Sequence, residues 1–269
     1  MEFVKMHGIG NDYVFVDCFR NEAPSDPSKT SIEISKFHTG IGSDGLILML
    51  PDDEADARMR IFNKDGSEGG MCGNGIRCMG KYLYDSGLVK KDVMKIATGS
   101  GVRTLEIFTE KGEAKTVRVD MGKPEIEKDM VEIVFPDGRK AGFTALSLGN
   151  PHAMTLDYFP EDDVAFERNG SFAENHPVFP NRANISFCKV KDFTHLTARI
   201  WERGSGPTLA CGTGACATLA AAVHRGVCSR KAHVSLPGGE RFIEWDEKTG
   251  CVFMTGPAEI SFTGIWRQK

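Results

Sequence analysis

The sequence contains no hydrophobic run long enough to cross a membrane. None approaches the roughly 18 consecutive apolar residues that a spanning helix needs. The chain also lacks a basic block, and its 33 lysines and arginines are outnumbered by 37 aspartates and glutamates, which gives a net charge of −4. These absences argue against a membrane protein, a membrane-surface helix and a nucleic-acid-binding surface.

The amino-terminal segment lacks the charged region and long apolar stretch of a signal peptide; it reads MEFVKMHGIGNDYVFVDC. We therefore expect a cytoplasmic protein whose eight cysteines are reduced thiols rather than a disulfide framework. Cysteine is among the residue types most often buried, so the ordinary interpretation of each one is a small core residue.

Patterns typical of a metal or cofactor site are also missing. The cysteine pairs Cys72–Cys78 and Cys211–Cys216 do not have the spacing of the paired Cys or His ligands of a structural zinc site. The glycine-rich segments match neither a Walker loop nor a clean dinucleotide fingerprint. No segment is a convincing pyridoxal-phosphate site, although the sequence alone leaves open a lysine that could hold one. We expect no metal and no cofactor.

What the chain does contain is an internal repeat with a constant offset of 139 residues. The segment MCGNGIRC (71–78) aligns with ACGTGACA (210–217), which pairs Cys72 with Cys211. With the same offset, residues 60–63 align with 199–202, and Gly10-Asn11 aligns with Gly149-Asn150. Three separate blocks in one register indicate a duplicated unit.

The repeat predicts two similar α+β domains. Each half has short alternating runs that are typical of strands, among them EFVKMHG, RMRIFN, TARIWE and HVSLPGG. Each half also has one clear helix, predicted over about 73–86 and 212–225 and ended by Gly87 and Gly226. We expect a mixed or antiparallel sheet around a central helix in each domain, a passage between domains near 110–125, and surface loops at 23–31 and 159–182.

Each repeated cysteine comes directly before its helix. A helix N-terminus lowers the pKa of a thiol and stabilises a nearby anion, so Cys72 and Cys211 are candidate bases. Inverting a carbon requires one group that removes a proton from one face and a similar group that delivers a proton to the other. Two related domains with a substrate between them would supply such a pair. The repeat therefore favours an amino-acid epimerase.

Polar residues at equivalent places extend this pattern. Asn63 and Glu202 each end an apolar strand face nine residues before a cysteine, although either alone could be a strand end in solvent. Asn11 and Asn150 could hold a ligand amine or carboxylate, or could serve only as turn residues.

Two further residues of the second half are candidates for the site. His152, whose counterpart in the first half is Tyr13, could tune a thiol or be an ordinary core histidine. Arg203 could bind a carboxylate in bidentate geometry or lie in solvent.

At these residues the chain resembles the diaminopimelate epimerase family, and the resemblance covers essentially all of it. The matching segments are KMHGIGNDYVFVD, GIGSDG, RIFNKDGSEGGMCGNGIRC, GNPHA, ERGSGPTLACGTGACA, LPGG and MTGPAEI. The resemblance implies cofactor-independent interconversion of LL- and meso-diaminopimelate, on the route to lysine and peptidoglycan, by a homodimer. It also implies that the last strand returns to the first domain, which gives domains of 1–115 with 258–269 and of 116–257.

The same resemblance implies roles for individual residues. Cys72 and Cys211 would be the acid/base thiols, assisted by His152 and Glu202. The substrate-binding residues would be Asn11, Asn63, Gly73, Asn74, Asn150, Asn184, Glu202, Arg203, Gly212 and Thr213.

The chain departs from the family at two positions. Gly45 stands where some members have a substrate-binding glutamine, and Thr213 replaces a common serine but keeps the hydroxyl.

Two alternative functions remain at this point. Proline racemases and hydroxyproline epimerases also use paired cysteines between two such domains, but the NKDGSE and ERGSG segments favour diaminopimelate. A thiol redox or binding protein would instead use Cys72 and Cys211 as a reversible disulfide, and would not need the matched asparagine and glutamate positions.

Overall fold

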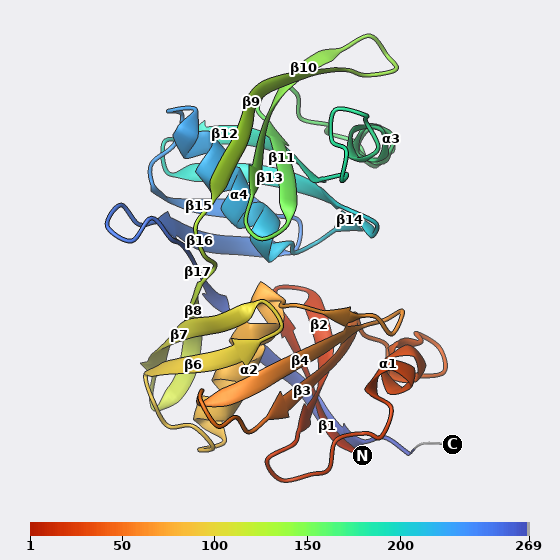
Figure 1. Ribbon diagram of the computed structural model, residues 1–269, viewed down its shortest axis with the longest axis vertical. Helices are drawn as coiled ribbons and strands as arrows, with labels where there is room; N and C mark the ends of the chain where they lie inside the picture. Colours follow the sequence, from red (N-terminus) through yellow and green to blue (C-terminus); the bar gives the residue numbers. More distant parts are fainter. Residues whose placement is uncertain (268–269) are drawn as a thin grey trace. The chain divides into compact units, whose positions relative to one another are not determined.

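The computed structural model describes residues 1–267, which divide into two compact units (Figure 1). Unit 1 contains Met1–Asp120 and the chain from Thr255 onward, and unit 2 contains Met121–Met254. The expected returning segment, 258–269, includes residues 268–269, which lie outside the described residues. Within residues 1–267, no helix is long and apolar enough to span a bilayer.

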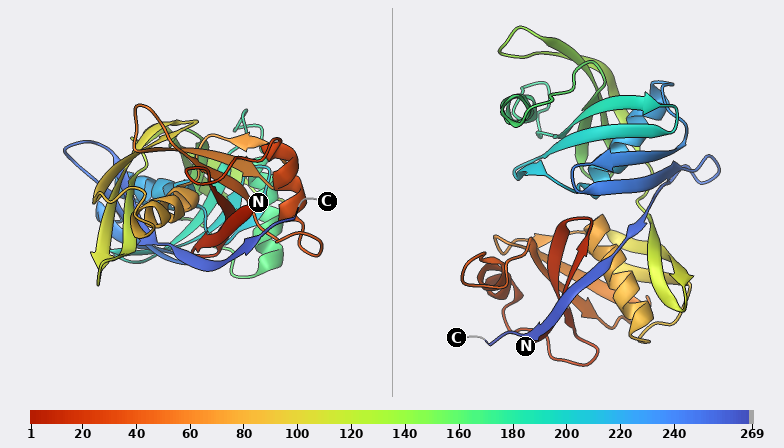
Figure 2. Two further views of the ribbon diagram at one scale, coloured as in Figure 1. Left: turned by 90° about the horizontal axis from the view of Figure 1, so that it is seen from below. Right: turned by 180° about the vertical axis from the view of Figure 1, so that it is seen from behind.

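Unit 1 consists of a twisted sheet and two helices. The carboxy-terminal strand β18 lies against β1, as the right view of Figure 2 shows with β18 in blue and β1 in red. The elements of unit 1 are β1 (Glu2–Gly8), β2 (Asn11–Asp17), α1 (Pro27–Ser35), β3 (Gly45–Leu50), β4 (Ala57–Asn63), β5 (Glu68–Gly69), α2 (Gly73–Asp85), β6 (Val93–Thr98), β7 (Gly101–Glu110), β8 (Glu113–Asp120) and β18 (Glu259–Ile265).

Unit 2 has the same kinds of element in the same order. The boundary between the units falls within β17 (Val252–Pro257). The other elements of unit 2 are β9 (Glu125–Val134), β10 (Lys140–Ser147), β11 (Pro151–Thr155), α3 (Asp163–Glu174), β12 (Asn184–Asp192), β13 (His195–Glu202), β14 (Gly206–Thr208), α4 (Gly212–His224), β15 (Lys231–Leu236) and β16 (Gly239–Trp245).

The two units pair their strands in one order. In unit 1, β1 is antiparallel to β18 and β2, β2 is parallel to β3, β3 is antiparallel to β4, β4 is parallel to β6, and β6 is antiparallel to β7. Unit 2 repeats this order with β9, β10, β11, β12, β13, β15 and β16. The predicted fold class, two similar α+β domains with mixed sheets, is confirmed.

The central helices α2 and α4 are buried by their sheets. Helix α2 packs against β1, β2, β7 and β8, and α4 packs against six strands of unit 2. The apolar positions Ile76, Met79 and Leu83 of α2 are fully buried, and the alanine-rich α4 is buried along most of its length. Both helices begin and end within a residue of the predicted positions. Burial of apolar surface therefore fixes the helix that carries each cysteine at its start.

Two predicted loops contain helices, so the loop prediction was wrong for 27–31 and for 163–174, which is half of the segment 159–182. Helix α1 is capped by Asp26, which accepts from the Lys29 N–H, and α3 by Asp162, which accepts from the Ala165 N–H. The polar residues that indicated loops are N-caps, and each short helix buries one face against strands of its own unit.

Candidate active site

Each central helix begins at a cysteine. Cys72 is the N-cap of α2 and Cys211 is the N-cap of α4, a position that Ser, Thr, Asp and Asn usually occupy. The Sγ atom of Cys72 accepts a hydrogen bond from the Gly75 N–H, and that of Cys211 from the Gly214 N–H, both at 3.4 Å. Each sulfur therefore lies where a helix N-terminus stabilises a thiolate.

The residue that donates to each sulfur is a glycine that packs closely on the strand behind it. A Cβ atom at Gly75 would lie 2.5 Å from Cδ1 of Ile47 on β3, and one at Gly214 would lie 2.7 Å from Cδ1 of Ile200 on β13. Without a side chain, the first helical turn packs directly on the strand behind it. This close approach fixes the cysteine relative to the sheet in both units.

In unit 1, the side chains of Asn11 and Asn74 gather at Cys72. The Cys72 thiol donates to Asn11 Oδ1 at 3.3 Å, and Asn74 Nδ2 donates to the same oxygen at 3.0 Å. Asn11 begins β2, whereas Gly73 and Asn74 form the first turn of α2, where backbone N–H groups point out of the helix. The structure thus brings together four of the predicted site residues of unit 1.

Tyr13 also belongs to this cluster. It lies on β2 and is only 7% exposed, and its hydroxyl is hydrogen-bonded to the side chains of Cys72 and Asn11. Burial raises the pKa of Tyr13, and the nearby Cys72 and Asp44 raise it further, so the phenol is neutral at physiological pH. The repeat offset identified Tyr13 as the counterpart of His152 but gave it no role.

The remaining predicted residue of unit 1, Asn63, hydrogen-bonds to a different partner. It ends β4, where its Nδ2 donates to Ser67 Oγ at 3.0 Å. Its partner across the sheet is Gly45. A Cβ atom at Gly45 would lie 2.1 Å from the Phe62 carbonyl oxygen, so this backbone leaves no room for the glutamine of some relatives.

In unit 2, the side chains of Thr213 and Glu202 lie next to Cys211. The Thr213 hydroxyl lies 3.8 Å from Cys211 Sγ. Burial raises the pKa of Cys211 well above its ordinary value, and the neighbouring Glu202 carboxylate raises it further. The Gly214 N–H and the Thr213 hydroxyl act in the opposite direction. Glu202 is therefore an acceptor for the Cys211 proton in the resting thiol form.

His152 is linked to this cluster through Asn150. The Nε2 atom of His152 lies 2.9 Å from Asn150 Oδ1, and Asn150 Nδ2 donates to Thr213 Oγ1 at 3.4 Å. Burial lowers the pKa of His152 to about 3, and the positive charge of Arg203 acts in the same direction. His152 is thus a neutral imidazole at physiological pH, and it is connected to Cys211 through Asn150 and Thr213.

Asn184 and Arg203 complete the predicted set. Asn184 stands beside His152 in the parallel register of β11 and β12. Its Nδ2 donates to the Pro151 carbonyl at 2.9 Å, and its Oδ1 accepts from the Arg203 N–H at 3.0 Å. Asn184 therefore fixes the backbone at Arg203, whose guanidinium donates to the Asn181 carbonyl at 3.0 Å.

A cavity of about 430 Å³ in unit 2 adjoins three of these residues, Asn150, His152 and Arg203. Its other lining residues include Lys128 of β9 and Arg182. This volume is large enough for a small polar molecule such as an amino acid. Its wall carries two arginines and a lysine together with one glutamate, Glu127, and this excess of positive charge favours a ligand that carries a carboxylate.

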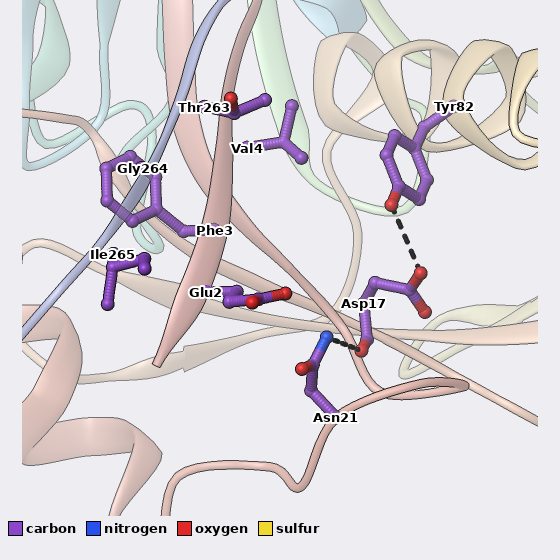
Figure 3. A pocket seen from close by; sticks show the side chains of 9 residues that line it. All are labelled: Glu2, Phe3, Val4, Asp17, Asn21, Tyr82, Thr263, Gly264 and Ile265. Carbon is purple, nitrogen blue, oxygen red and sulfur yellow. Dashed lines mark hydrogen bonds between the residues drawn. The ribbon is translucent and has the colours of Figure 1, made fainter.

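A second cavity, of about 330 Å³ in unit 1, contains none of the predicted site residues (Figure 3). There the Tyr82 hydroxyl donates to Asp17 Oδ2 at 3.1 Å, and Asn21 donates to the Asp17 carbonyl at 3.1 Å. These polar groups are paired with each other.

Each unit therefore holds one cluster of polar residues around a thiol at a helix start. Besides the role of Tyr13, sequence analysis missed Asp44, which lies in the first cluster and binds Asn11. Its signal was present in the segment GIGSDG, where a polar pair follows two flexible glycines just before a strand. None of the six other cysteines of residues 1–267 forms a disulfide.

Comparison with known proteins gives consistent matches over nearly the whole chain. The sequence model described as diaminopimelate epimerase matches residues 3–127 and 144–261. Proteins named diaminopimelate epimerase from Acetivibrio thermocellus and Bacteroides thetaiotaomicron are 47% and 48% identical, and each match covers 98% of this chain and 98% or 97% of the relative. The crystal structure of a probable proline racemase from Agrobacterium radiobacter superposes on this chain with a TM-score of 0.73 and 16% sequence identity. The match covers 100% of this chain and 93% of the racemase chain. At this identity the similarity shows the fold alone.

Proposed function

Because the chain belongs to the diaminopimelate epimerase family, we propose that it interconverts LL- and meso-diaminopimelate by a two-base mechanism in which Cys72 and Cys211 are the acid and the base. The enzyme is an isomerase that acts on an amino acid. The observation that carries the mechanism is the matched pair of N-cap thiols, which occupy the same position in two units of the same strand order.

The chemistry of inversion explains why two such thiols would be needed. One thiolate removes the α-proton, and the second thiol delivers its own proton to the opposite face of the same carbon. After one turnover the protonated and deprotonated thiols have exchanged places, so the reverse reaction can start from the product. Two groups of the same kind suit this reversal, because each must act as acid in one direction and as base in the other.

The helix starts would stabilise the charge that develops as the α-proton leaves. That charge spreads into the substrate carboxylate, which backbone N–H groups of Gly73, Asn74, Gly212 and Thr213 can bind. Glu202 would accept the proton of resting Cys211 and so prepare the thiolate. His152 would act as a neutral hydrogen-bonding group, since its pKa of about 3 leaves it uncharged.

The other polar residues would hold the substrate. Asn11 and Asn150 lie at the two thiol clusters and can bind the α-amino or α-carboxylate group. Asn63, at the end of β4, and the hydrogen-bonded pair Asn184 and Arg203 would bind the distal amino-acid end of diaminopimelate. The positively charged wall of the unit 2 cavity supports a carboxylate at that end.

We also propose that the enzyme needs no cofactor and works in the cytoplasm as a homodimer, on the route to lysine and peptidoglycan. None of the eight cysteines is in a disulfide, which suits a reducing compartment. The homodimer and the pathway rest on membership of the family.

The function is tested by incubating the reduced protein with LL-diaminopimelate, without added cofactor, and resolving the stereoisomers by chromatography. We expect the meso isomer to accumulate to equilibrium from either starting isomer. Proline and trans-4-hydroxyproline serve as matched alternative substrates. Turnover of either one without turnover of diaminopimelate would replace the proposed substrate, and no turnover of any would favour a redox or binding role for the thiols.

A further inference from the structure

Asp44 is a carboxylate with no role in the mechanism above, yet it binds a residue that contacts Cys72. It lies in the turn before β3, where its Oδ2 accepts hydrogen bonds from Asn11 Nδ2 at 2.6 Å and from the Asp12 N–H at 3.1 Å. Its own N–H donates to the Asp12 carbonyl at 2.9 Å, and its carbonyl accepts from the Lys64 N–H at 3.0 Å. These contacts hold the carboxylate at the start of β2.

The carboxylate decides which way the Asn11 amide faces. An ionised carboxylate only accepts hydrogen bonds, so Asn11 must turn its Nδ2 toward Asp44. The Oδ1 atom then faces Cys72 Sγ at 3.3 Å and Asn74 Nδ2 at 3.0 Å. Because an amide oxygen also only accepts, Cys72 has to supply the proton of this contact.

We propose that Asp44 is a positioning residue that, through the orientation of the Asn11 amide, keeps Cys72 protonated in the free enzyme. The inference rests on the two-thiol reaction proposed above, in which a protonated Cys72 is the acid. In that step the Cys72 proton moves to the α-carbon and the Cys72 thiolate is left, while the Cys211 thiolate takes the original α-proton. The Asn11 oxygen then faces an anion, which favours return of a proton to Cys72.

Other ionisable groups act on this pair and have to be separated from Asp44. Tyr13 of β2 contacts both Cys72 and Asn11, and Cys78 of α2 lies near Cys72. Asp12 and Lys64 flank Asp44 with opposite charges. Burial raises the pKa of Asp44, but the Asp12 N–H and the Asn11 amide both favour its ionised form.

Unit 2 has no equivalent of this arrangement. The repeat offset places Ala183 at the position of Asp44. The Asn150 amide is turned the other way, with Oδ1 toward His152 and Nδ2 toward Thr213 beside Cys211. The proposed role of Asp44 is therefore specific to the Cys72 side.

Two substitutions of Asp44 separate the effect of its negative charge from the effect of the hydrogen-bond acceptor that it offers to Asn11. Both donors bind the same oxygen, Oδ2, and an asparagine oxygen can take that place, so Asp44→Asn removes the charge but keeps Asn11 oriented. Asp44→Leu removes the charge and the acceptor with little change in size. The control is Asp12→Asn, which removes a neighbouring carboxylate that pairs with Lys5 and leaves the partner of Asn11 in place.

The readout is the rate of Cys72 alkylation by iodoacetamide as a function of pH, because alkylation follows the thiolate fraction. Trypsin releases Cys72 in the peptide of residues 65–77, in which it is the only cysteine, so mass spectrometry quantifies it alone. The measurement needs no substrate, so it stands even if the protein does not epimerise diaminopimelate.

We expect the midpoint of the pH profile of Cys72 alkylation to lie about one pH unit lower in Asp44→Leu than in Asp44→Asn. This difference corresponds to a factor of about ten in the protonation equilibrium of the thiol. Epimerisation by Asp44→Leu should fall by about tenfold relative to Asp44→Asn, the size of one hydrogen bond to a reacting group. Asp44→Asn and Asp12→Asn should each shift the midpoint downward by less than Asp44→Leu, since each removes one negative charge and keeps the acceptor of Asn11 in place.

Equal midpoints for Asp44→Asn and Asp44→Leu would overturn the proposal, because charge alone would then explain the effect. A wild-type midpoint in Asp44→Leu would overturn it as well. If Asp44→Leu does not give the wild-type far-ultraviolet circular dichroism spectrum, Asp44→Ala replaces it with the same expectation and the same contrary results.

Discussion

The two thiol clusters share a backbone frame but differ in the side chains that control the sulfur. At Cys72 the partners are an amide oxygen, from Asn11, and a neutral phenol, from Tyr13. At Cys211 they are the Thr213 hydroxyl and the Glu202 carboxylate. The shared frame gives both sulfurs a helix N-terminus, whereas the different partners give each sulfur its own preference for a proton.

The asparagines show the difference most clearly. Asn11 and Asn150 are equivalent by the repeat, yet Asn11 turns its oxygen toward the thiol and Asn150 turns its nitrogen toward Thr213. On the far side of the amide lies a carboxylate in unit 1 and an imidazole in unit 2. A duplicated site can therefore acquire unlike acid and base halves through neighbours that the duplication does not share.

The largest expected effect comes from removing either thiol. Cys72→Ala and Cys211→Ala should each lower epimerisation by at least about 10³-fold, because each removes one of two obligatory proton-transfer groups. Stereoisomer-resolved assays with protein of wild-type circular dichroism measure this loss. Full activity in either variant would end the two-base account, and unequal losses would sharpen the comparison of the two sites.

A smaller loss is expected from Glu202→Gln. The carboxylate raises the pKa of Cys211, so its removal should lower that pKa and move alkylation of Cys211 to lower pH, while epimerisation falls by about 10²-fold with the lost proton acceptor. Glu240→Gln, an exposed carboxylate of unit 2 paired with His233, is the control. An unchanged Cys211 profile in Glu202→Gln would contradict the role of this carboxylate.

His152 should make stability depend on pH. Its folded pKa is about 3 and its unfolded value is near 6.5, so the unfolded chain binds more protons between these values and stability falls as pH falls through that window. The slope is about 1.4 kcal/mol per pH unit, a factor of ten in the folding equilibrium. Urea unfolding at pH 7, 6 and 5 should give a shallower dependence for His152→Gln, and equal slopes would mean that the buried imidazole does not stay neutral.

The smallest effect is expected from Tyr13→Phe. The hydroxyl bonded to Cys72 stabilises the thiolate, so its loss should raise the pKa of Cys72 and lower epimerisation by about threefold, the size of a typical single hydrogen bond. Tyr82→Phe removes a hydroxyl that binds Asp17 in the same unit and is the matched control. The same Cys72 alkylation profile in both variants would show that Tyr13 has no influence on the thiol.

Much of this arrangement could be predicted from the sequence because duplication and helix periodicity leave strong local patterns. The offset of 139 residues pairs Cys72 with Cys211, and the apolar spacing with Gly87 and Gly226 marks the central helices. These features are set by residues close together in the chain, so a single sequence is enough to find them.

Other parts depend on contacts between distant residues. Asp44 and Asn11 are 33 positions apart and meet only because β2 and β3 are parallel neighbours. Helices α1 and α3 were predicted as loops because their capping aspartates are also typical turn residues, and only packing against the sheet decides between the two. The orientation of an amide likewise depends on its neighbours and not on its own sequence.

The most direct test of the two-thiol account follows deuterium during the first few per cent of conversion of LL-diaminopimelate in heavy water. The account predicts deuterium at the inverted carbon of every meso product and no deuterium in the recovered LL substrate, because the proton delivered comes from a solvent-exchanged thiol and the proton removed stays on the other one. Protium at the inverted carbon of the product would mean that one group removes and returns the same proton, and would contradict the account.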